Sequence, residues 1–214
     1  MNITYLPFLK KMATLFNVSA EDASIPVISG IYGTLLVDEY LGRPFPANLT
    51  KEDYENMNHL HYWYAYAKYN NDLAKAFNTN KLKRVISDFD DRIANLASKP
   101  LKWTFINCHD TDMMPLSQYL DLADSKCIEE LYRKGSTQEL NCNYKISFAS
   151  SIIFELHSDD GKKFSVKIRK DGKYVYLCGR PSQSCPYEEW KEDIVKTYVD
   201  VNRVCNGPGE ESLE

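Results

Sequence analysis

The chain has 214 residues, of which 26% are charged, and its formal net charge at pH 7 is −4. This acidic balance argues against a nucleic-acid partner, because binding along a phosphate backbone needs a clustered positive surface. No apolar run is long enough to cross a membrane, and Lys10 and Lys11 interrupt the apolar N-terminal stretch that a signal peptide would need. We therefore expect no membrane span, and these residues contain no visible signal peptide.

The first 80 residues are expected to be helical. Residues 31–40 are a candidate for a short apolar helix, and the Pro-containing stretches 25–30 and 43–46 are expected to break the chain on either side. A longer helix is expected to begin at Thr50, because Thr50 can cap it while Asp53 completes a capping box. This helix carries aromatic side chains that are expected to pack against other helices: Tyr54, Tyr62, Trp63, Tyr64, Tyr66 and Tyr69.

His59 and His61, on the same expected helix, could bind a metal. Helical geometry would point the two side chains in different directions, and no cysteine or acid completes a ligand set. The chain has six cysteines, but none forms a Cys-x-x-Cys pair, so a zinc ribbon is not expected either. We therefore expect no metal and no cofactor.

The middle of the chain contains the best candidate for a functional site. Residues 81–97 have apolar side chains at helical spacing, and Pro100 would end this helix. Residues 102–107 read as a buried strand, and a helix capped by Thr111 or Asp112 is expected to run to about Leu122. His109 and Asp110 would then lie at the carboxyl end of a strand, which is where open α/β sheets bind their ligands.

Cys108 precedes this pair and could be proposed as a nucleophile activated by His109. Adjacent residues of a strand point to opposite faces, so Cys108 is instead expected to be a small core residue.

The remaining residues read as a loop, a sheet and a helix. Residues 124–143 are polar and are expected to form a loop or an excursion. Three strands are expected at residues 148–156, 164–169 and 174–177, with turns at Asp159-Asp160-Gly161 and Asp171-Gly172. Glu155 lies within the first strand, so it must face solvent or have a partner. Pro186 and Tyr187 open a last amphipathic helix, and the composition after residue 205 predicts disorder.

Cys178 and Cys185 flank a short loop that is rich in turn-forming residues. The loop can bring the two thiols together, and we expect them to form a disulfide if the compartment is oxidising.

The order of these features resembles the C-terminal half of the histidine acid phosphatases of the lysosomal and prostatic type. The series runs from the His109-Asp110-Thr111 strand and helix, through the hairpin, to Cys178–Pro186, the last helix and Cys205. The resemblance implies an α/β fold with part of the sheet found in phosphoglycerate mutases and acid phosphatases, flanking helices and a C-terminal antiparallel meander. Residues 1–80 would be a helical cap-like region, residues 81–205 the C-terminal part of the phosphatase core, and residues 206–214 a disordered tail.

The resemblance also implies a chemistry, the hydrolysis of phosphate monoesters. In that family a histidine within an N-terminal Arg-His-Gly motif attacks phosphorus, and arginines neutralise the phosphate. By the match, His109 would hold a phosphate oxygen and Asp110 would act as the general acid that protonates the leaving alkoxide. The family further implies an extracellular or lysosomal location, and it ties a C-terminal cysteine, here Cys205, to its N-terminal half.

The chain departs from the family because no Arg-His-Gly motif is present. None of its four histidines, His59, His61, His109 and His157, follows an arginine or precedes a glycine. One interpretation is that the nucleophile-bearing half lies outside these residues. A second is a catalytically inactive, phosphatase-like structural or interaction subunit. Either one predicts an open sheet edge covered by further chain or by a protein subunit, and allows an oligomer.

A third interpretation is a complete small enzyme with a relocated nucleophile. It predicts that activity is lost when His59, His61 or His157 is changed to alanine.

Overall fold

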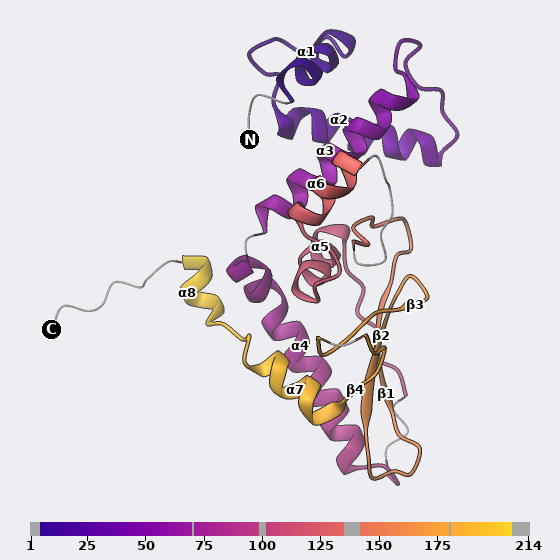
Figure 1. The fold of residues 1–214 in the computed structure, drawn as a ribbon, viewed down its shortest axis with the longest axis vertical. Helices are drawn as coiled ribbons and strands as arrows, with labels where there is room; N and C mark the ends of the chain where they lie inside the picture. The colour runs from indigo at the N-terminus through magenta and orange to yellow at the C-terminus, as the bar shows by residue number, and fades with distance from the viewer. Residues whose placement is uncertain (1–4, 70, 99–101, 135–141, 180, 207–214) are drawn as a thin grey trace, which may run out of the picture. The chain divides into compact units, whose positions relative to one another are not determined.

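The computed structural model describes residues 5–69, 71–98, 102–134, 142–179 and 181–206. In these residues the chain forms helices and one antiparallel sheet, a mixed architecture that fits the α/β class in its general sense (Figure 1). The chain divides into two compact units, Met1–Lys68 with Ala123–Tyr144, and Tyr69–Leu122 with Lys145–Glu214. No helix in the described part of the chain is both long enough and apolar enough to cross a bilayer.

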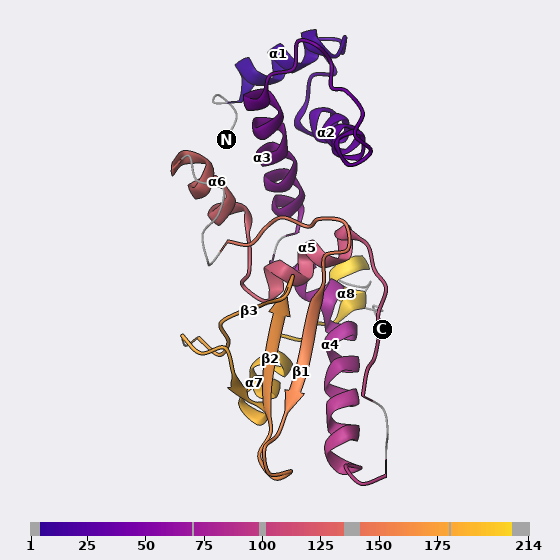
Figure 2. The same ribbon diagram turned by 90° about the vertical axis from the view of Figure 1, so that its right-hand side faces the viewer.

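The first unit is helical. Its helices are α1 (Leu6–Leu15), α2 (Ile25–Tyr40), α3 (Lys51–Lys68) and α6 (Ser125–Lys134). Figure 2 shows α2 and α6 on opposite sides of α3, and both helices contact it. The buried core between α1, α2 and α3 consists of Leu9, Met12, Ile28, Tyr32, Leu35, Met57 and Leu60.

The start of α3 confirms the predicted capping box. The Asp53 N–H donates to the Thr50 hydroxyl over 3.1 Å, and the Thr50 N–H donates to the Asp53 carboxylate over 3.3 Å. Lys11 of α1 also donates to Asp53 over 2.6 Å, so this cap joins two helices. Burial alone would raise the pKa of Asp53, but the bonds from Lys11 and Thr50 hold it below its ordinary value.

Two local predictions for this unit were wrong. Residues 25–30 do not break the chain, because α2 begins at Ile25 and Pro26 occupies its first turn, where a missing N–H costs nothing. Residues 124–143 were expected to form a loop or an excursion without a helix, yet α6 occupies residues 125–134. Asp124 accepts the Cys127 N–H over 2.7 Å at its start, and Ile128 and Leu131 are buried on one face.

The helical part was expected to end near residue 80 and to exclude residues 123–144. The first unit instead ends at Lys68 and includes residues 123–144. A disulfide between Cys127 and Cys142, with a Cα to Cα distance of 5.8 Å, joins the two ends of this later segment. The expected tail, residues 206–214, lies outside the described residues except for Asn206, which ends a helix.

The second unit contains the sheet. Its helices are α4 (Asn71–Ala94), α5 (Asp110–Tyr119), α7 (Tyr187–Val195) and α8 (Val201–Asn206). Its strands are β1 (Ile152–His157), β2 (Ser165–Lys170), β3 (Lys173–Tyr174) and β4 (Cys185–Pro186). Strand β2 pairs antiparallel with each of the other three, and within the described ranges β1 has only β2 as a neighbour.

The core of this unit lies between the sheet and two helices. Val166 and Ile168 of β2 face Leu82 and Ile86 of α4, and α7 adds apolar side chains. Figure 1 shows α4 and α7 on the same side of the sheet. The predicted turns are confirmed: Gly161, Asp171 and Gly172 have positive φ angles of 69°, 50° and 80°, which Gly and Asp tolerate best.

Candidate functional site

The His109-Asp110 pair lies at the start of α5. The backbone carbonyl of His109 accepts the N–H of Met113 over 3.1 Å, so His109 is the N-cap residue, rather than Thr111 or Asp112 as predicted. Asp112 Oδ2 accepts the His109 N–H over 3.3 Å, and Asp110 Oδ1 accepts the Thr111 N–H over 2.7 Å. Both side chains of the pair are exposed, at the positive end of the helix dipole.

Lys81 is a neighbour of this pair that the sequence did not single out. Its ammonium group donates to Asp112 over 2.8 Å and thereby joins α4 to the first turn of α5. The bond from Lys81 holds the pKa of Asp112 below its ordinary value. A lysine so far before the site in the chain gives no sequence signal, because only the packing of α4 on α5 brings it there.

The predicted buried strand before this pair is not present. Residues 102–109 form no strand, and they are all exposed. Among the described residues, no backbone group of 102–108 makes a hydrogen bond with another backbone group. Phe105 is 93% exposed and Trp103 75% exposed. The pattern of a buried strand thus occurs in a segment that pairs with no strand among the described residues.

A side-chain hydrogen bond joins this segment to α4. The Thr104 hydroxyl donates to Asp88 of α4 over 2.9 Å. Cys108 was expected in the core but is an exposed free thiol, and partial burial and Asp112 raise its pKa, which disfavours a nucleophilic thiolate.

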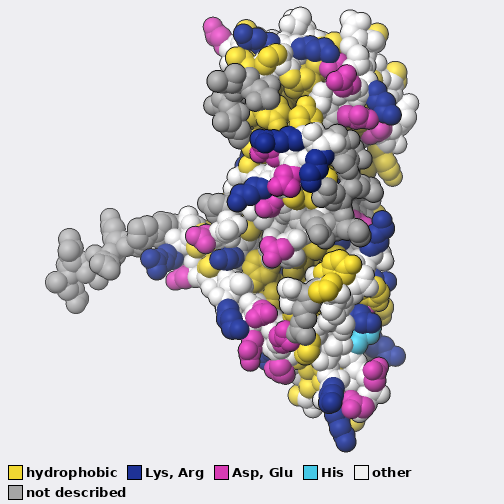
Figure 3. Space-filling view, in the orientation of Figure 1, with side chains coloured by type: hydrophobic (Ala, Val, Ile, Leu, Met, Phe, Trp, Pro, Cys, Tyr) yellow, Lys and Arg dark blue, Asp and Glu magenta, His cyan; other side chains and the backbone are white. Residues whose placement is uncertain are grey.

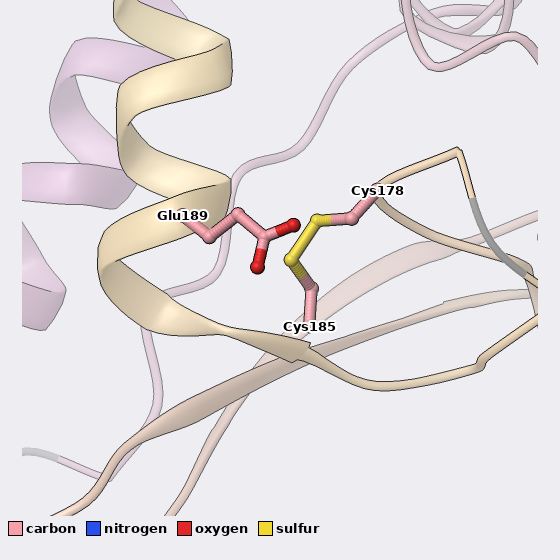
Figure 4. A group of neighbouring side chains, drawn as sticks. All are labelled: Cys178, Cys185 and Glu189. Carbon is pink, nitrogen blue, oxygen red and sulfur yellow. A yellow bond between two sulfur atoms is a disulfide. The ribbon is translucent and has the colours of Figure 1, made fainter.

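The predicted disulfide between Cys178 and Cys185 is confirmed. Figure 4 shows the carboxylate of Glu189, on α7, directed toward it, and these three side chains are the one group in the described residues whose spacing could suit a metal. The two sulfur atoms are bonded to each other, and a disulfide supplies no thiolate ligand. The two cysteines therefore form a covalent cross-link, and Glu189 is a residue of the neighbouring helix α7.

His59 and His61 have separate partners in the helical unit. His59 is only 6% exposed and stacks on Tyr132 with ring centroids 4.0 Å apart. His61 Nδ1 lies 2.9 Å from the Ser29 hydroxyl. The two rings are part of helix packing, and this arrangement leaves His59 little access to a substrate.

Glu155 has partners on the outer face of the sheet. His157 Nε2 lies 2.8 Å from its carboxylate, the Tyr174 hydroxyl donates over 3.0 Å, and the Arg169 guanidinium forms an ion pair. Burial alone would raise the pKa of Glu155, but these bonds hold it below its ordinary value. His157, the third candidate for a relocated nucleophile, thus belongs to a charged cluster on the sheet.

Replacing Glu155 by alanine should lower the free energy of unfolding by about 1–3 kcal/mol, because the arginine and tyrosine lose their common acceptor. Urea denaturation of Glu155→Ala measures this. The control is Glu192→Ala, which changes an exposed glutamate of α7 and should alter stability by less than about 0.5 kcal/mol. Equal effects of the two substitutions would contradict a stabilising role for the cluster.

Comparison with family models and with curated protein sequences gives no relative. No family model matches the chain, and no curated protein sequence matches it. The histidine acid phosphatase assignment therefore stays a prediction that rests on the order of residues and elements in this chain.

Proposed function

We propose that this chain is the C-terminal part of a histidine acid phosphatase-like protein that hydrolyses phosphate monoesters. In this proposal His109 binds a phosphate oxygen, Asp110 is the general acid, and the histidine nucleophile comes from a segment outside these 214 residues. The two disulfides support an oxidising compartment, which agrees with an extracellular or lysosomal location. The finer fold assignment, part of an acid phosphatase sheet, belongs to the same proposal.

The observation that carries the proposal is the uncovered surface around the His-Asp pair. His109 and Asp110 are exposed together at the N-terminus of a helix, where an anion is stabilised. The apolar segment directly before them is also exposed, and its backbone groups are unpaired with other backbone groups within the described chain. Further chain that supplied a strand here would bury Trp103 and Phe105 and would bring a nucleophile beside His109.

The proposed chemistry requires two functions of the residues present, which are phosphate binding and proton transfer. His109 would bind an oxygen of the phosphate at the positive end of the α5 dipole, which favours the negative charge of the phosphate. Asp110 would give its proton to the oxygen of the leaving alcohol while the phosphoryl group moves to the histidine nucleophile. In the second step Asp110 would take a proton from the water that attacks the phosphohistidine, which restores the starting state.

The proposal is tested on the complete native protein, produced from its full gene. Asp110→Asn should lower kcat by about 10²–10⁴-fold, because an amide cannot donate the proton. The loss should be greater with an alkyl phosphate than with p-nitrophenyl phosphate, whose leaving group needs less protonation. The substitution should leave KM nearly unchanged, because the asparagine side chain keeps an oxygen that can accept the Thr111 N–H.

The matched control is Asp171→Asn, a turn residue with φ of 50° that asparagine also tolerates. It should retain full activity. A native protein without phosphomonoesterase activity, or an Asp110→Asn variant as active as the control on both substrates, would refute the catalytic proposal.

The second candidate is a catalytically inactive, phosphatase-like subunit whose exposed segment is covered by another protein. The absence of an Arg-His-Gly motif from the 214 residues favours it. The mass of the denatured, reduced native protein separates the two candidates. A mass near 24.7 kDa without activity supports the subunit, and about twice that mass with activity supports the enzyme.

A further inference from the structure

Two copies of one short sequence pattern occur in the helical unit, and each copy begins with an asparagine. Residues 17–22 read Asn-Val-Ser-Ala-Glu-Asp, and residues 48–53 read Asn-Leu-Thr-Lys-Glu-Asp. Each copy therefore opens with an Asn-x-Ser/Thr sequon, the acceptor sequence for N-linked glycosylation. The chain has one further sequon, at Asn2, which lies outside the described residues. Asn17 and Asn48 are thus candidate modification sites that the proposed reaction does not use.

Both asparagines lie at the surface and outside the helices. Asn17 follows α1, Asn48 lies between α2 and α3, and both residues are exposed. Asn17 has a φ of 54°, a turn conformation that asparagine tolerates. Among the described residues, neither side-chain amide takes part in a hydrogen bond. A sugar chain attached to either amide would therefore break no hydrogen bond of the described chain, and it would lie at the surface, where glycans are found.

The sequon hydroxyl closes the same kind of turn in both copies of the pattern. The Ser19 hydroxyl donates to the Asp22 carboxylate over 2.6 Å and accepts the Asp22 N–H over 3.1 Å. The Thr50 hydroxyl makes the same two bonds with Asp53, over 2.7 Å and 3.1 Å. Each asparagine precedes its turn by two residues, so the bonds of the turn leave the acceptor amide free. The glycosyl transferase reads a sequon in the unfolded chain, and the turn forms after the sugar is attached.

The disulfides support the compartment that this modification needs. The Cys127–Cys142 and Cys178–Cys185 bonds are expected only where the environment is oxidising, as it is along the export route on which N-linked glycans are added. Figure 3 shows hydrophobic side chains at the surface of the helical unit among charged ones. A bulky, polar glycan would make such a surface more soluble.

We propose that Asn17 and Asn48 each carry an N-linked oligosaccharide. In the transfer, the side-chain amide nitrogen forms a bond to the anomeric carbon of an oligosaccharide that is held on a lipid diphosphate. The bond from that carbon to the diphosphate oxygen breaks, the lipid diphosphate leaves with the electron pair, and the amide nitrogen loses one proton. The proposal rests on the oxidising location in the proposed function, but it does not rest on phosphatase activity.

The experiment uses the complete native protein, isolated from its source and digested to peptides. A peptide N-glycosidase in heavy-oxygen water removes each glycan and converts its asparagine to a labelled aspartate, which mass spectrometry locates. Asn17 and Asn48 should both be found as labelled aspartate. Asn80 is the control within the same molecule, because it is exposed but has Leu82 in place of the sequon hydroxyl, and it should remain asparagine.

Variants of the full gene, expressed in cells of the source, test each site by itself. Asn17→Asp and Asn48→Asp should each lower the mass of the protein by one oligosaccharide, and aspartate also tolerates the positive φ at position 17. Asn80→Asp is the matched control and should leave the glycan mass unchanged. Ser19→Ala should remove the glycan from Asn17, whereas Ser19→Thr should retain it, because threonine keeps the hydroxyl.

The same native sample separates failure of this proposal from failure of the proposed function. If the two disulfides are intact and either asparagine is unmodified in every molecule, the proposal is wrong for that site and the location stands. If the cysteines are free thiols and no glycan is present, both the location and the glycosylation proposal are wrong. A glycosylated protein without phosphomonoesterase activity supports this proposal and refutes only the catalytic one.

Discussion

Acidification should destabilise the helical unit through His59. Burial of this side chain lowers its pKa from 6.5 to about 4, and the nearby Glu129 opposes the shift only in part. The unfolded chain therefore binds a proton at a higher pH than the folded chain does. The free energy of unfolding should fall as the pH falls from about 6.5 to about 4, by about 3 kcal/mol in total.

Urea denaturation at a series of pH values measures this loss, with His59→Phe as the informative variant. Phenylalanine can still stack on Tyr132 but cannot take up a proton, so the pH dependence of its stability should be shallower by the same amount. The control is His157→Gln, which removes a histidine of the sheet whose side chain is 40% exposed. If wild type and His59→Phe lose stability in parallel between neutral and acid pH, the buried histidine is not responsible.

Trp190→Ala should destabilise the second unit strongly, more than Glu155→Ala does. Trp190 is only 3% exposed and lies among the rings of Phe89, Phe154 and Tyr187, with centroid separations of 6.1–6.3 Å. It therefore joins α4, β1 and α7 in one cluster. Truncation leaves a large cavity there, and the free energy of unfolding should fall by about 3–5 kcal/mol.

Trp103→Ala is the matched control for this substitution. Trp103 is 75% exposed, so its removal should change the stability of the isolated chain by less than about 0.5 kcal/mol. Both variants are compared by urea denaturation under the same conditions. A Trp103 variant as unstable as the Trp190 variant would mean that the exposed segment packs against the chain in solution.

The Trp103→Ala substitution can also be tested in the larger protein that the proposed function requires. If further chain or a subunit covers residues 103–106, as the proposed function requires, Trp103→Ala should destabilise the complete protein although it does not affect the isolated chain. The two measurements on the same variant therefore test whether the segment is covered in the native molecule.

The correct predictions concern structures built from neighbouring residues. The capping box at Thr50 and Asp53 requires only the right side chains three residues apart. The turn at Asp171-Gly172 requires residues that accept positive φ, and the Cys178–Cys185 disulfide closes a short loop.

The wrong predictions at α2 and α6 also concern neighbouring residues, whose helical signals were overlooked. Pro26 fits the first turn of a helix, and Ile128 and Leu131 are at helical spacing within a polar segment.

The candidate site likewise has features that neighbouring residues predict and features that depend on tertiary packing. The sequence placed a helix after His109-Asp110, and α5 is present there, although its cap lies two or three residues earlier than expected. The contact between Lys81 and Asp112 could not be predicted, because it depends on how α4 packs against α5. The partners of Glu155 likewise come from the pairing of β1 with β2 and from β3.

The sequence by itself determined the capping box of α3, the tight turns, the loop disulfide and the presence of a helix at the His-Asp pair. Only the tertiary structure decided the state of residues 102–107, whose apolar pattern suits a buried strand but whose backbone groups find no strand among the described residues. The physical reason is that a turn or a helix cap is complete within a few residues. A strand is complete only when a distant segment supplies its hydrogen bonds and covers its side chains.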